Sequence, residues 1–294
     1  MTNPTLIFLN QVRDNLDHVD YSLIYQSIKD LRDKMVPTAI LRKGWFIDRV
    51  RPNEKGEIFS NKEQVSYIHD KQILESRVVY GRANESKQAV FYGSIISPKI
   101  KMPRAVAYFE TSTLLKEIDS KQNIEEVFTM SRWRIMEDIE VVQMIFSEEA
   151  LKVSEYAQRS LANQLKNYQH LPLAQHYEEQ GKFFSNEFAR DDIGKDEEYK
   201  YKISSAYANY LWNNTPYQGI TYPSVPLKYL GQNVALLPNI VDTHLALESV
   251  AMFKFERINE TNYPIDSFKI ATDLGINQMD FQWVDYVGKD HQEQ

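Results

Sequence analysis

The side chain best suited to catalysis in this chain is the carboxylate of Glu110. On a helix its neighbours along one face are Ala107 and Leu114, which turns the carboxylate toward the core or a cleft wall. A charge in such a place is costly unless it is paired. Glu110 is therefore either an acid that stabilises a developing cation or a glutamate at the edge of the apolar stripe that reaches solvent or an arginine.

Three arginines are candidates for holding an anion. Arg49 and Arg51 alternate on one face of a predicted strand with Ile47, so either guanidinium could point inward. An inward guanidinium needs an anionic partner, which a phosphate or a cross-strand carboxylate would provide. Arg82 lies in the turn-like segment Gly81-Arg82-Ala83-Asn84, which is typical of a loop that presents a side chain to a ligand or to solvent.

Two further residues have the chemistry to contact a ligand. Tyr92 follows Phe91 on a predicted strand, where it could pack in the core or stack on a flat heterocycle. Ser224 follows Pro223, which fixes the backbone at a strand end and suits ligand contact, although serine is common in such turns.

The elements that must position these residues follow one another in blocks. Apolar periodicity predicts a helical hairpin over residues 1–40, a helix from Pro103 to about Ile118, and three helices within 147–214. Alternating patterns predict strands at 45–51, 89–93, 219–222, 233–237 and 248–257, and two more within 127–146. Because helices and strands do not alternate as βα units, we predict an α+β fold with antiparallel or mixed sheets. Residues 1–40 would be an accessory layer on a main domain, 41–294, whose helical insertion spans about 147–214.

The composition excludes several kinds of chemistry. The 294 residues include no cysteine, which removes thiolate nucleophiles and cysteine-ligated zinc. The ten glycines are spread too widely for a dinucleotide fingerprint or a phosphate loop. A net charge of -7 argues against nucleic acid as the main partner. We expect no metal site and no membrane contact, and the absence of a leader or long apolar run predicts a cytoplasmic protein.

Five segments, in this order, resemble the RES domain, a family named for its arginine, glutamate and serine. They are Phe46-Ile47-Asp48-Arg49-Val50-Arg51-Pro52, Gly81-Arg82-Ala83-Asn84 leading to Val90-Phe91-Tyr92, Ala107-Tyr108-Phe109-Glu110, Gly219-Ile220-Thr221-Tyr222-Pro223-Ser224, and Asn233-Val234-Ala235-Leu236-Leu237-Pro238. The resemblance covers roughly residues 45–257. The family includes toxins of bacterial toxin–antitoxin pairs that destroy NAD, on a fold similar to that of ADP-ribosyltransferases.

The resemblance implies a role for each candidate residue. Glu110 would stabilise an oxocarbenium-like ribose, and Ser224 would hydrogen-bond the nicotinamide–ribose end. Arg82, with Arg49 or Arg51, would grip the pyrophosphate of NAD. The catalytic set would be Arg82, Glu110 and Ser224, and the binding set would be Arg49, Arg51, Tyr92, Tyr222 and Asn233. This chain departs from the family at Ala83, where a large aromatic residue is usual, and in its longer helical insertion and N-terminal hairpin.

The activity implied by this resemblance is cleavage of the nicotinamide–ribose bond of NAD, by phosphorolysis or hydrolysis. NAD would be a substrate rather than a cofactor, and inorganic phosphate would be the co-substrate of phosphorolysis. Two alternatives stay open: an ADP-ribosyltransferase acting on a macromolecular target, and a non-catalytic protein that binds NAD, ADP-ribose or a partner. An antitoxin protein and a homodimer also stay open as partners.

Overall fold

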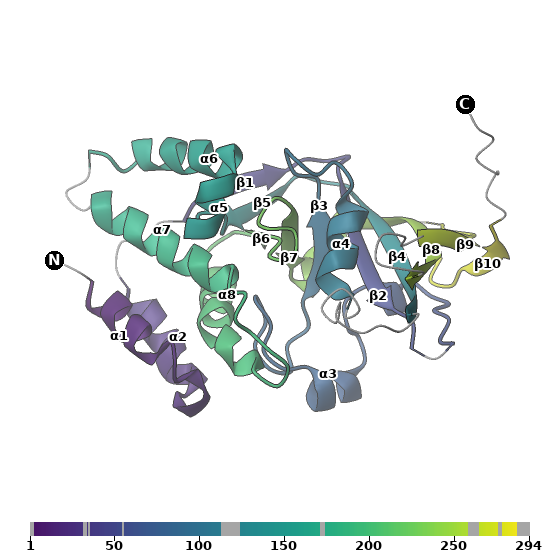
Figure 1. The fold of residues 1–294 in the computed structure, drawn as a ribbon, viewed down its shortest axis with the longest axis horizontal. Helices are drawn as coiled ribbons and strands as arrows, with labels where there is room; N and C mark the ends of the chain where they lie inside the picture. Colours follow the sequence, from purple (N-terminus) through teal and green to yellow (C-terminus); the bar gives the residue numbers. More distant parts are fainter. Residues whose placement is uncertain are drawn as a thin grey trace.

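One mixed β-sheet runs through the computed structural model, which describes residues 3–31, 34, 36–54, 56–112, 124–170, 174–257, 265–275 and 278–286 (Figure 1). Within these residues the strand order is β1-β5-β6-β7-β3-β2-β4-β8-β9-β10. The strands are β1 (Thr38–Leu41), β2 (Phe46–Pro52), β3 (Phe91–Ile95), β4 (Ile124–Ile135), β5 (Ile139–Gln143), β6 (Gly219–Pro223), β7 (Gln232–Leu236), β8 (Leu245–Arg257), β9 (Ile265–Thr272) and β10 (Gln282–Asp285). In the described part of the sheet, β5 and β6 run parallel and the other pairs run antiparallel.

Helices lie on the sheet and beside it. They are α1 (Pro4–Val12), α2 (Tyr21–Asp30), α3 (Lys71–Arg77), α4 (Pro103–Thr111), α5 (Glu148–Val153), α6 (Glu155–Lys166), α7 (Ala174–Phe188), α8 (Lys202–Asn214) and α9 (Pro238–His244). The α+β class and the mixed sheet predicted from the sequence are therefore confirmed. Among these residues, no helix is both long enough and apolar enough to span a lipid bilayer.

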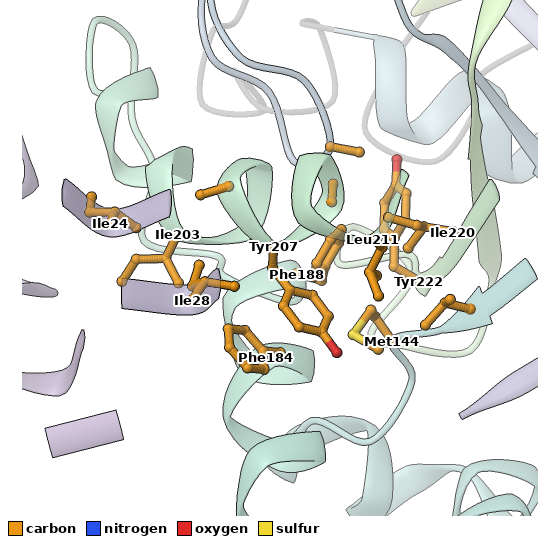
Figure 2. Close-up of a cluster of buried hydrophobic side chains, with 14 of the residues drawn as sticks. Ile24, Ile28, Met144, Phe184, Phe188, Ile203, Tyr207, Leu211, Ile220 and Tyr222 are labelled. Atoms are coloured by element: carbon orange, nitrogen blue, oxygen red, sulfur yellow. The ribbon is translucent and has the colours of Figure 1, made fainter. Parts of the chain in front are cut away.

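The N-terminal hairpin forms a layer on the helices of the insertion. Asn3 caps α1, because its side-chain oxygen accepts a hydrogen bond from the Thr5 N–H at 2.9 Å. Ile24 and Ile28 of α2 are fully buried against α8. Figure 2 shows these side chains in one cluster with residues of α7 and α8 and with Met144, Ile220 and Tyr222 at the sheet. The order of layers is therefore sheet, insertion helices and hairpin.

Two helix predictions were wrong at serine residues. The described part of the insertion contains four α-helices rather than three, because Ser154 ends α5 and caps α6 by accepting a hydrogen bond from the Ala157 N–H. Helix α4 ends at Thr111 rather than near Ile118. The next residue, Ser112, is extended, and its hydroxyl donates a hydrogen bond of 2.8 Å to the carboxylate of Glu126 on β4. Leu114 and Ile118 lie outside the described residues. Helices α3 and α9 were not predicted.

The sheet opens between β2 and β3. These strands pair at one position, Asp48 opposite Ser94, whereas β2 pairs with β4 along its whole length and β3 likewise with β7. Helix α4 contacts β2, β3 and β7 and lies over this opening (Figure 1). The other face of the sheet packs Ile47 and Phe91 against a separate apolar cluster that includes Phe59 and Ile240.

Candidate functional site

A row of polar side chains crosses five strands beneath α4. Tyr222 lies opposite Asn233, Asn233 opposite Ser94, Ser94 opposite Asp48, and Asp48 opposite Arg132. Residues that face each other on antiparallel strands project to the same side of a sheet, so all five project toward α4. Arg132 binds Asp48 through two hydrogen bonds, of 2.7 and 2.9 Å. The row therefore places five polar side chains on the sheet face that α4 covers.

Glu110 is held by this row. The side-chain amide of Asn233 donates a hydrogen bond of 2.8 Å to Oε1 of Glu110. The Ser94 hydroxyl in turn donates to Oδ1 of Asn233, also at 2.8 Å. Ser94 and Asn233 are buried, so the connection from the sheet to the carboxylate is shielded from water. The half-buried carboxylate of Glu110 therefore has a fixed orientation.

A small pocket of about 70 Å³ lies next to this carboxylate. Of the eight residues that the sequence proposed for the site, five line it: Arg49, Tyr92, Glu110, Tyr222 and Asn233. The lining combines one carboxylate, one guanidinium and two aromatic rings. These groups could bind a ligand with both an anionic part and a flat ring.

The structure places Arg49, and not Arg51, at the pocket. Arg49 donates a 2.7 Å hydrogen bond from Nη1 to the carbonyl oxygen of Tyr92 across the sheet opening, and its guanidinium lies 5.3 Å from the centre of the Phe91 ring. Its Nε is buried and has no hydrogen-bond partner among the described residues. Burial, with a smaller contribution from the charge of Arg51, lowers the pKa of Arg49 to about 10.

Arg51 points elsewhere on the same strand. Its Nη1 donates to the carbonyl oxygen of Gln64, and its guanidinium stacks 4.5 Å from the centre of the Phe59 ring. Burial lowers the pKa of Arg51. This arginine therefore ties β2 to the segment before α3 and does not line the pocket.

Tyr92 holds the loop that contains Arg82. Its hydroxyl accepts a hydrogen bond from the Ala83 N–H at 2.9 Å and donates one to Oδ1 of Asn84 at 2.8 Å. A Cβ on Gly81 would lie 2.3 Å from the same Asn84 oxygen, so a larger residue there would displace the Asn84 side chain from the Tyr92 hydroxyl. Burial raises the pKa of Tyr92, which keeps the hydroxyl neutral and able to donate. Ala83 is fully buried in the core that includes Tyr222.

Arg82 is bound to the end of α7 instead of lining the pocket. Its Nη1 and Nη2 donate to the carbonyl oxygens of Phe188 and Arg190 at 2.8 and 3.0 Å. A guanidinium at this position satisfies carbonyls at the helix C-terminus and complements the helix dipole. Arg82 nevertheless lies near the pocket, because its charge acts on Tyr222. Burial is the largest cause that raises the pKa of Tyr222, followed by the charges of Tyr92 and Glu110, and the charge of Arg82 lowers it.

Ser224 lies outside the pocket, in the turn between β6 and β7. Its N–H donates to the Gly231 carbonyl at 2.9 Å, and its own carbonyl accepts from the Tyr229 N–H at 2.8 Å. The residue is fully buried, and its Oγ has no hydrogen-bond partner in the described part of the chain. A Cβ on Gly231 would lie within 3.0 Å of Ser224 and Val106, so the turn packs directly on α4, one helical turn from Glu110. Ser224 does not line the pocket.

Sequence reasoning missed Ser94, which connects the sheet to Glu110 through Asn233. The signal was available, because Ser94 is two positions after Tyr92 and so projects from the same face of β3. No group of three or more histidine, aspartate or glutamate side chains among the described residues could hold a metal ion. No protein-family model matches the chain, and no curated protein matches it either.

Proposed function

We propose that the chain binds NAD with its nicotinamide–ribose end at the Glu110 pocket and cleaves the bond between nicotinamide and ribose. One observation carries this proposal: a carboxylate oriented by Asn233 borders the same pocket as Arg49, whose buried Nε lacks a hydrogen-bond partner in the described structure. A negatively charged group and a positively charged group at one small pocket suit a ligand that carries a developing cation and a phosphate.

The chemistry needs few protein groups. When the bond between the ribose C1′ and the nicotinamide nitrogen breaks, its electron pair leaves with nicotinamide and the ribose becomes oxocarbenium-like. A fixed carboxylate stabilises that charge, as in glycoside hydrolysis. An oxygen of water or phosphate then bonds to C1′, and when water is the nucleophile it loses a proton to the solvent. Glu110 would supply the carboxylate, and Tyr92 or Tyr222 would stack on a ring.

The size of the pocket sets a condition on this proposal. Small-molecule sites usually enclose about 300–1,000 Å³, whereas this pocket encloses about 70 Å³. A whole dinucleotide therefore requires a wider site. Release of Arg82 from the Phe188 and Arg190 carbonyls would free a guanidinium for the pyrophosphate. The nicotinamide–ribose end would then also approach the turn that carries Ser224.

A second function has its own support. Arg82 is bound by helix carbonyls and Ser224 is enclosed, and both facts favour a protein that retains a ligand pocket without turnover. Such a protein would bind NAD or ADP-ribose and leave NAD intact.

One assay separates these functions. The purified protein is incubated with NAD, with and without inorganic phosphate, and free nicotinamide is measured by chromatography while binding of ADP-ribose is measured by calorimetry. Release by wild type that Glu110→Gln abolishes supports cleavage, and dependence on phosphate distinguishes phosphorolysis from hydrolysis. Glu140→Gln, a change at an exposed carboxylate on β5, is the matched control and should release nicotinamide as wild type does. Binding without release indicates the non-catalytic function, and neither binding nor release contradicts both.

A further inference from the structure

A second hollow lies away from the Glu110 pocket, and the proposed function does not use it. Two neighbouring depressions of about 320 and 360 Å³ share Pro98, Tyr156 and Gln232 in their linings, and the two together are here called the edge groove. Its floor includes Thr221 of β6 and Gln232 of β7. Because side chains alternate along a strand, this floor is on the sheet face opposite to that of Tyr222 and Asn233.

Large apolar side chains line the edge groove and remain exposed to solvent. Ile40 of β1 is 38% exposed, Trp45 in the turn before β2 is 44% exposed, and Ile96 after β3 is 43% exposed. Exposed apolar side chains gathered on one surface mark an interaction site, and tryptophan is among the residues that contribute most to protein interfaces.

Two polar side chains of the groove, Gln143 and Tyr156, already have hydrogen-bond partners within the protein. The Gln143 amide donates to the Tyr156 hydroxyl at 2.7 Å, and its carbonyl accepts from the Ser160 hydroxyl at 3.0 Å. A site for a small polar ligand presents several convergent polar groups that are free to bind it. The groove instead offers mainly apolar contact, as the centre of a protein interface does.

The charge at the rim is positive, although the chain as a whole carries a net charge of -7. Lys99 and Lys101 line the two parts of the groove, and both side chains are exposed. Neither ammonium forms an ion pair with any residue that the structure describes. Arg159 also lies at the rim, but Glu155 pairs with it at 3.0 Å. Two uncompensated positive charges therefore flank an apolar groove.

We infer that the edge groove docks a peptide segment of a partner protein, with apolar side chains in the groove and carboxylates beside Lys99 and Lys101. The exposed apolar lining and the cationic rim favour this occupant over a small polar ligand. The opposite sheet face carries the Glu110 pocket, so the inference stands whether or not the chain acts on NAD.

The probe is a displayed library of random dodecapeptides, selected on the folded full-length protein. A selected peptide is then synthesised, and its affinity is measured by fluorescence anisotropy for wild type, Lys99→Glu/Lys101→Glu and Trp45→Ser/Ile96→Ser. The matched control is Lys29→Glu/Lys71→Glu, which changes the charge equally at exposed positions of α2 and α3. Thermal melting shows that each variant is folded, and sedimentation gives the oligomeric state.

We expect selected peptides to combine aromatic or aliphatic residues with flanking aspartate or glutamate. Their affinity should fall about tenfold or more in each groove variant, decrease with added salt, and stay unchanged in the control. Failure to enrich any peptide overturns the inference, and so does binding that neither groove variant weakens. Enrichment of basic peptides also overturns it. A dimer that Trp45→Ser/Ile96→Ser dissociates would assign the groove to a second copy, and binding of dodecanoate without any peptide would assign it to a small amphiphile; either result replaces the inference.

Discussion

The amide of Asn233 fixes the carboxylate of Glu110 through a 2.8 Å hydrogen bond between residues 123 positions apart in the chain. Asn233 is itself fixed, because its carbonyl oxygen accepts from the buried Ser94 hydroxyl. A carboxylate aligned before a ligand arrives needs no reorganisation to stabilise a positive charge. The sequence proposed Asn233 as a ligand-binding residue; in this structure it lines the pocket, and its amide orients Glu110.

Asn233→Ala should therefore destabilise the protein and misplace Glu110. The change leaves the Ser94 hydroxyl without its partner in a buried site, which costs about 1–3 kcal/mol. If the chain cleaves NAD, nicotinamide release should fall about 100-fold as the carboxylate moves. Urea unfolding and the nicotinamide assay measure the two effects. Ser94→Ala keeps the bond between Asn233 and Glu110 and should change both quantities less. An unfolding free energy of Asn233→Ala equal to that of wild type would contradict the predicted loss of stability.

Arg82→Ala should loosen the end of α7. Two hydrogen bonds from a charged donor are lost, and we expect the free energy of unfolding to fall by about 2 kcal/mol. Hydrogen exchange should increase in the last turn of α7 and at residues 188–190. Arg82→Lys should be intermediate, because an ammonium cannot reproduce the two-pronged contact. Arg104→Ala, at an exposed arginine on α4, should change stability by no more than about 0.5 kcal/mol. Equal stability of Arg82→Ala and Arg104→Ala would show that the helix-end contact contributes nothing.

The sequence predicted what depends on local pattern. Period-two and period-3.6 spacing identified most strands and the N-terminal hairpin, and Asn3 and Pro4 marked the start of α1 correctly. Ser94, Asn233 and Glu110 are connected by hydrogen bonds, and the predicted site residues included Asn233 and Glu110 but not Ser94. The element predictions depend on neighbours within a few positions, whereas Asn233 was included through the family resemblance.

What the sequence did not predict depends on distant pairing. Arg49 and Arg51 are equivalent by alternation, and only the opening between β2 and β3 brings Arg49 to the pocket. Arg82 binds carbonyls 106 and 108 positions away, so no local pattern could show that it was already engaged. The family resemblance likewise assigned Ser224 to the pocket. In the structure, the turn between β6 and β7 packs Gly231 against Val106 and encloses Ser224.

Two arginines on β4 provide a comparison of buried and exposed ion pairs. Arg132 binds Asp48, whose side chain is fully buried, whereas Arg134 binds Glu248, and both members of that pair are partly exposed. Arg132→Ala leaves a buried carboxylate unpaired, and we expect a loss of about 3 kcal/mol in the free energy of unfolding. Arg134→Ala should cost at most about 1 kcal/mol. Adding Asp48→Asn to Arg132→Ala should recover part of the loss, because it removes the unpaired charge. Similar losses of unfolding free energy in the two single variants, measured by urea unfolding, would contradict the expectation that the buried pair contributes more than the exposed pair.

Asp192 should make the protein less stable as the pH falls from about 4 to about 2. Two hydrogen bonds from Arg190, at 2.8 and 2.5 Å, lower the pKa of Asp192 from 3.8 to about 2. In that window the unfolded chain takes up a proton that the folded chain does not, so stability is fully present above pH 4 and is lost on acidification. The carboxylate is half-exposed, which limits the effect to at most about 1 kcal/mol. Urea unfolding at a series of acidic pH values should show a shallower decline for Asp192→Asn than for wild type. Asp285→Asn changes a far more exposed carboxylate, which pairs with Lys269, and should follow the wild-type curve. Parallel curves for wild type and Asp192→Asn would contradict the link between the lowered pKa of Asp192 and stability.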